Sequence, residues 1–144
     1  MYPQAEAPPS ATPVTYDQML ERVRYDGAYP TRQRAEQTVR IVLTALGRQL
    51  SADERAEVAT RLPVEAARIL TAEPPSTESL TGWGFVKDLA TRTGGTPATT
   101  RWDVGTVLPL VAHLSGDDLL NRILAQLPSG YALLFGRAEL LQAA

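Results

Sequence analysis

Two stretches of this sequence share one layout. Residues 50–63 read LSADERAEVATRLP, and residues 114–128 read LSGDDLLNRILAQLP. Each begins with Leu-Ser, carries acids two and three positions after the serine, continues with an apolar-rich run and closes with Leu-Pro. Such a serine and acid are typical of a helix N-terminus, and a proline disfavours helical backbone in the residue before it. The pair therefore predicts one helical unit that occurs twice in the chain.

Residues that can cap helices stand at several points along the chain. Ser51 and Ser115 are the expected N-caps of the two similar stretches, and Thr15, Thr31 and Thr96 take the same position before other helical patterns. The residue that follows a helix often adopts a left-handed backbone conformation, which glycine takes without strain. Two helices are accordingly expected to end at Gly27 and Gly94.

Between these caps, apolar residues recur three or four positions apart, as they do along one face of a helix. Each half of the chain is too short to bury a sufficient core alone, so we expect the halves to share one. The sequence predicts an all-α fold, with two tandem four-helix repeats packed into one compact helical domain. The residues expected to face the core include Ala35, Val39, Val42, Leu43, Leu46, Leu50, Ile69, Leu70, Trp102, Leu108, Val111, Leu119, Leu120, Ile123, Leu124, Leu133, Leu134 and Phe135.

The expected organisation has five parts. Residues 1–14 are rich in proline and alanine, a composition that buries too little apolar surface to order a chain, so we expect a disordered tail. The first repeat spans 15–70, a proline-containing linker 71–79, the second repeat 80–136 and a C-terminal tail 137–144. Pro109 falls inside the long helix of the second repeat. An interior proline clashes with the carbonyl four residues back, so we expect a kink or a break near residues 105–109.

The amino-acid composition excludes several classes of functional site. The chain has no cysteine and one histidine, which excludes disulfides and thiolate metal sites, and we expect no cofactor. Its 14 basic and 16 acidic residues leave a net charge of −2, so no general basic field draws it to nucleic acid. We see neither a signal peptide nor an apolar run of the roughly 18 residues that a membrane span needs. We therefore expect a cytoplasmic protein that does not enter the membrane.

His113, Ser115, Asp117 and Asp118 lie close enough in sequence to raise the hypothesis of a hydrolase. A catalytic triad, however, is assembled in space with an oriented base and an oxyanion site. Helix capping explains the serine, and the helix dipole explains the two acids. We favour the capping interpretation and expect no enzyme activity.

Two further groups are candidates for binding. Arginines and tyrosines surround the first helix–helix turn, and we interpret them as a partly ion-paired surface with an acidic protein as the next hypothesis and nucleic acid as a third. These residues are Arg22, Arg24, Tyr25, Tyr29, Arg32 and Arg34. Trp83, Trp102 and Pro109 could line a pocket between the repeats, although the helical spacing of both tryptophans favours the core.

The whole pattern resembles the bacterial family called domain of unknown function 2267. MLERV at 19–23 and FVKDL at 85–89 look like the leading pieces of its two units, and the two Leu-Ser stretches supply the rest. The resemblance covers about residues 15–135 and implies an all-helical fold, and it supplies no catalytic residues that could be assigned to this chain. Pro109 and the glycines at 82, 84 and 105 depart from the family pattern.

Our leading functional hypothesis is a non-enzymatic helical module that binds another protein as an adaptor, scaffold or regulator. The alternative is a small-molecule sensor or an enzyme with a pocket near Trp83 and Trp102. Weak nucleic-acid binding through the turn between Arg22 and Arg34 is the third hypothesis, and self-association into a homo-oligomer stays open.

Overall fold

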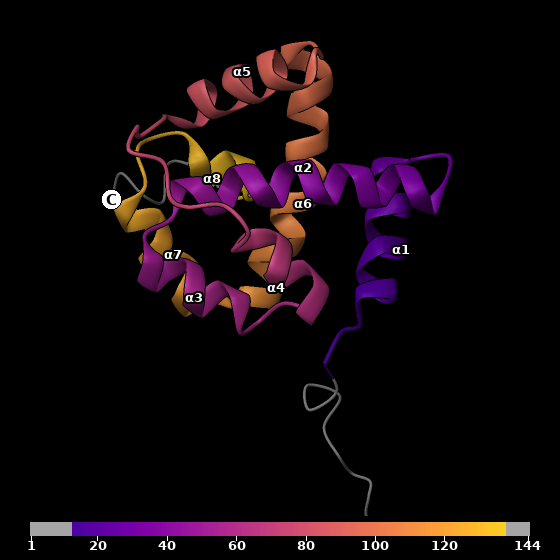
Figure 1. The fold of residues 1–144 in the computed structure, drawn as a ribbon, viewed down its shortest axis with the longest axis horizontal. Coiled ribbons are helices and arrows are strands. Elements are labelled where there is room, and N and C mark those ends of the chain that lie inside the picture. Colours follow the sequence, from indigo (N-terminus) through magenta and orange to yellow (C-terminus); the bar gives the residue numbers. More distant parts are fainter. Residues whose placement is uncertain (1–12, 138–144) are drawn as a thin grey trace, which may run out of the picture.

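The computed structural model describes residues 13–137, which form eight helices and, within that range, no strand (Figure 1). The all-α prediction is confirmed. The predicted tails at 1–14 and 137–144 fall almost wholly outside the described residues. The helices are α1 (Tyr16–Gly27), α2 (Arg32–Gln49), α3 (Ala52–Ala59), α4 (Val64–Leu70), α5 (Gly82–Thr93), α6 (Pro97–Ser115), α7 (Asp117–Gln126) and α8 (Tyr131–Leu134). In residues 13–137 no helix combines the length and apolarity needed to cross a membrane.

Local capping accounts for most helix starts. The Thr15 and Ser51 side chains accept hydrogen bonds from the backbone of Gln18 and Glu54, whose own side chains bond back to the caps. Thr31 and Thr96 also cap as predicted, and Pro97 occupies the first turn of α6. Each such cap stabilises a helix by about 1 kcal/mol. These interactions join residues three positions apart, which is why sequence alone could identify them.

Ser115 is not the cap that the sequence predicted. It is the last residue of α6, is buried, and its hydroxyl has no hydrogen-bond partner among the described residues. Gly116 alone separates α6 from α7, with φ 88°. A side chain disfavours that conformation, so glycine permits the short connection. The longer α6 therefore moves the serine from a helix start to a helix end.

One hydrophobic core takes residues from both halves of the chain. The predicted stripe of α2 is fully buried, as are Leu119, Leu120, Ile123 and Leu124 of α7. α6 packs against α1, α2, α5, α7 and α8, while α2 packs against α1, α4 and α6. These two long helices therefore form the centre of the fold. Leu133 corrects the prediction for α8, because it is 54% exposed while Leu134 and Phe135 are buried.

Pro109 lies inside α6, which runs unbroken from Pro97 to Ser115. We predicted a kink or a break near residues 105–109, and the continuous helix shows that the break is wrong. A proline removes one backbone hydrogen bond and costs about 3 kcal/mol, but packing can outweigh that cost. Five helices pack against α6 and supply such contacts.

Tyr131 has a buried hydroxyl without a hydrogen-bond partner among residues 13–137. Its ring packs against Phe85, with the ring centroids 5.6 Å apart. An unsatisfied buried hydroxyl costs roughly 1–3 kcal/mol. Tyr131→Phe is therefore expected to raise the free energy of unfolding by about 1 kcal/mol, because it removes the cost and keeps the ring. Urea denaturation measures this, and a loss of stability would mean that the hydroxyl is bonded in solution.

Candidate functional site

The arginines around the first turn are largely engaged with nearby acids. Arg22 pairs with Asp26 at 2.8 Å and Arg24 with Glu21 at 3.0 Å. Arg32 reaches Asp17 across the turn, and Arg34 donates to the Gln37 side chain at 3.5 Å. Tyr25 stands 80% exposed beside them. This agrees with the partly ion-paired surface that the sequence predicted.

Tyr29 does not belong to that surface, which corrects its assignment as an exposed candidate. It is buried, and its hydroxyl donates to the Asp103 carboxylate at 2.6 Å. The Trp102 indole Nε1 donates to the Gly27 carbonyl at 3.0 Å. We call these two contacts the Tyr29 clamp. The clamp fixes the turn between α1 and α2 against α6.

Gly27 has a steric role in the clamp and is not the helix cap that the sequence predicted. A Cβ at this position would lie 2.2 Å from the Tyr29 ring, so the absence of a side chain lets the ring close over the helix end. Ala28 takes the left-handed conformation after α1 instead, with φ 56°. The clamp therefore depends on a glycine inside the helix.

Alkaline pH is expected to weaken the Tyr29 clamp. Burial, and then the hydrogen bond to Asp103, raise the pKa of Tyr29 from 10.0 to about 12. Because the folded pKa lies above the unfolded value, this stabilisation is complete below pH 10.0 and is lost as pH rises towards 12. Urea denaturation across this window should show a steeper fall in stability for wild type than for Tyr29→Phe. Equal slopes would contradict the clamp.

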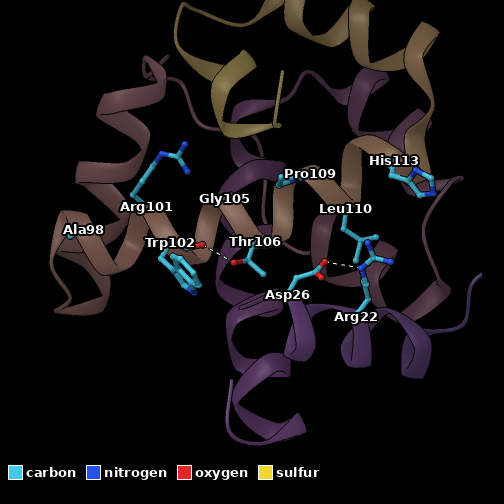
Figure 2. A pocket seen from close by; sticks show the side chains of 10 residues that line it. All are labelled: Arg22, Asp26, Ala98, Arg101, Trp102, Gly105, Thr106, Pro109, Leu110 and His113. Carbon is cyan, nitrogen blue, oxygen red and sulfur yellow. Dashed lines mark hydrogen bonds and ion pairs between the residues drawn. The ribbon is translucent and has the colours of Figure 1, made fainter. Parts of the chain in front are cut away.

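The predicted pocket of Trp83, Trp102 and Pro109 divides in the structure. Trp102 and Pro109 line a groove of about 820 Å³ between α1 and α6, which we call the α1–α6 groove (Figure 2). Trp83 lies apart on α5, with Lys87 Nζ 6.0 Å from its ring centroid. Neither tryptophan is core as their spacing suggested, since they are 59% and 57% exposed. Both stand on helix faces that no other helix covers fully.

A second concave surface lies between α2 and α5. α5 packs chiefly against α6, and in Figure 1 it lies above α2 near the top of α6. Two hollows of about 460 and 350 Å³ adjoin there and share Ile41 and Leu89. We call them together the α2–α5 groove. Its aliphatic and phenyl lining consists of Ile41, Val42, Ala45, Leu80, Phe85 and Leu89, and Tyr29 and Trp102 border it on the side of α6.

The α2 side of this groove is cationic. Arg34, Arg40 and Arg48 line it, whereas Glu36, the one acid of α2, does not. Arg40 pairs with Glu36 at 3.3 Å, and Arg48 lies 3.9 Å from Glu73. These ion pairs lie at the surface, with Arg48 partly buried, and such pairs are individually weak. The arginine row therefore remains able to attract a negatively charged partner.

The α5 side carries both signs of charge. Asp88 pairs with Arg92 at 2.7 Å. The partner attracted by the α2 side would therefore meet no net repulsion from this pair. Glu73 and Asp103 also line the groove, so it combines apolar side chains and an arginine row along α2 with acids elsewhere on its rim.

The hydrolase hypothesis gains no geometric support. His113 is exposed on α6 whereas Ser115 is buried, and no hydrogen bond joins them in the described part of the chain. Asp117 instead pairs with Arg137 at 2.5 Å. Within residues 13–137 there is also no group of three metal-ligating side chains.

An interhelical ion pair escaped the sequence interpretation. Arg122 of α7 donates two hydrogen bonds to Glu57 of α3, at 3.0 and 3.1 Å, and thereby lowers the pKa of that carboxyl. Each of the two residues stands six positions before the proline that closes its stretch, Pro63 or Pro128. The matching positions of these two oppositely charged residues were the sequence signal that α3 and α7 could contact each other.

Comparison with known proteins gives one family. The family model described as "Uncharacterized conserved protein (DUF2267)" matches residues 16–134. Comparison with curated proteins gives no match. The matched range contains all eight helices of the structure, and both grooves lie within it.

Proposed function

The chain belongs to the DUF2267 family, and we propose that it is a protein-interaction module of the bacterial cytoplasm that binds an amphipathic helix in the α2–α5 groove. The observation that carries this proposal is the apolar groove with an arginine row along one lip. Amphipathic helices dock into such grooves through apolar residues three and four positions apart. The partner is therefore a helix with one apolar stripe and acids along one flank.

The dimensions support a short helical partner. α5 has 12 residues, which corresponds to about 18 Å of helix at 1.5 Å per residue. A docked helix of similar length would run along the groove past Ile41, which is 37% exposed. Its acids would face Arg34, Arg40 and Arg48. Binding should weaken as salt rises, because exposed charges are screened.

Affinity capture from the host's lysate tests the proposal. The baits are the full wild-type chain and two variants of it. Ile41→Asp places a charge in the apolar lining and repels an acidic helix. Val64→Asp is the matched control, since Val64 is 61% exposed on α4 and outside the groove. We expect one stoichiometric partner on wild type and Val64→Asp, and its loss on Ile41→Asp.

Site-specific crosslinking then identifies the bound segment. A photoreactive residue at Thr44, which lines the groove, should crosslink to a partner peptide with apolar residues at helical spacing and acids on one flank. Capture by Ile41→Asp equal to wild type, or crosslinks confined to a segment without that pattern, would overturn the proposal. Crosslinks to a second copy of the chain would replace the partner by self-association.

A further inference from the structure

Trp102 presents an aromatic surface whose orientation is fixed. Its Nε1 donates to the Gly27 carbonyl at 3.0 Å, which satisfies the polar edge of the indole. The side chain is nevertheless 57% exposed and lines the α1–α6 groove. A planar group can stack on an aromatic ring held in this way, and stacking of a base contributes about 1–3 kcal/mol. Trp102 is therefore a preformed stacking surface.

Arg101 supplies a positive charge to the same groove. A Cβ at position 105 would lie 2.4 Å from Arg101 Nη1, so this side chain extends over the glycine one turn along α6. Arg101 has no ion-pair partner within residues 13–137. Glycine inside a helix costs about 1 kcal/mol relative to alanine. The glycine leaves the space that the guanidinium occupies.

The opposite wall limits where an anion can lie. Asp26 of α1 lines the groove and is paired with Arg22 at 2.8 Å (Figure 2). Arg22 lines the same wall, so the pair is close to neutral there, whereas Arg101 offers a positive charge at the α6 side. Pro109 and Leu110 give the space between them an apolar lining. The groove thus presents three features at different places in its lining: an aromatic surface, a cationic end and an apolar floor.

We propose that the α1–α6 groove binds a small planar aromatic ligand that carries an anionic group, with the ring on Trp102 and the anion at Arg101. Its volume of about 820 Å³ lies within the range of small-molecule sites. The ligand class follows from the two recognition elements together, an exposed indole and a guanidinium without an ion-pair partner. Trp102 also borders one hollow of the α2–α5 groove, but Ile41 does not line the α1–α6 groove and Arg101 does not line the α2–α5 groove, so variants at these two positions distinguish the sites.

Tryptophan fluorescence of the full chain tests this site. The sequence has two tryptophans, so Trp83→Phe leaves Trp102 as the only reporter. The probes are adenosine monophosphate, adenosine and ribose 5-phosphate, which carry ring and anion, ring alone and anion alone. We expect saturable quenching by adenosine monophosphate. Adenosine should bind about tenfold more weakly or worse because it lacks the group that bonds to the charged Arg101, and ribose 5-phosphate should do so because it lacks the ring that stacks on Trp102. Trp102→Phe, which leaves Trp83 alone, should lose the saturable signal.

Two variants separate binding from folding. Arg101→Gln should weaken adenosine monophosphate by about tenfold and leave adenosine unchanged. Gly105→Ala should do the same by displacing Arg101, while thermal stability is retained because alanine favours the helix.

The Ile41→Asp variant should bind adenosine monophosphate normally, so failure of the partner proposal would leave this result intact. Two results would overturn the proposal. One is the absence of saturable quenching both by adenosine monophosphate and by naphthoate, a second aromatic anion, at millimolar concentrations. The other is equal binding of adenosine monophosphate, adenosine and ribose 5-phosphate.

Discussion

Gly47→Ala is expected to destabilise the protein by about 2–3 kcal/mol, although alanine favours helices by about 1 kcal/mol over glycine. Gly47 lies in the last turn of α2, and a Cβ there would be 1.9 Å from the Leu70 carbonyl oxygen at the end of α4. Backbone atoms cannot move aside as a flexible side chain can. The substitution therefore has to push α4 away from α2.

Thermal and urea denaturation measure this loss, and Gly105→Ala is the matched control. The obstacle at position 105 is the end of the Arg101 side chain, which can rotate away. We expect the melting temperature to fall by roughly 5–10 °C for Gly47→Ala, and to stay level or rise for Gly105→Ala. A Gly47→Ala variant as stable as wild type would show that α4 does not hold this close position in solution.

Leu124→Asp is expected to unfold the domain. Leu124 is 7% exposed and belongs to the core to which both halves contribute. Truncating a buried leucine to alanine costs about 2–5 kcal/mol, and a buried carboxylate without a partner costs more. That loss is comparable with the total stability of a domain, which is about 5–15 kcal/mol.

Ala125→Asp provides the control for the added charge, since Ala125 is exposed on the same helix. Circular dichroism and size-exclusion chromatography should show an unfolded or aggregated Leu124→Asp variant beside a folded Ala125→Asp variant. A monomeric, cooperatively melting Leu124→Asp protein would contradict the placement of this face of α7 in the core.

The candidate sites were only partly predictable from sequence. Trp102 and Pro109 do share a groove, but Trp83 lies elsewhere on α5. Apolar spacing predicted Trp102 to be core because spacing reports which residues share a helix face, not whether another helix covers it. The α2–α5 groove had no sequence signal, since its lining joins side chains of α2, α5 and α6, which are far apart in the sequence and come together only by packing.

What the sequence determined by itself was local. Thr15 and Ser51 start their helices through hydrogen bonds to backbone three residues away, and the α2 stripe identifies the buried face wherever the helix packs. What only the tertiary structure decided was long-range. It buried Ser115 at a helix end, paired Tyr29 with Asp103 across 74 positions, and left Trp102 uncovered. The physical reason is that a cap depends on its immediate neighbours, whereas exposure depends on which distant helix packs against a residue.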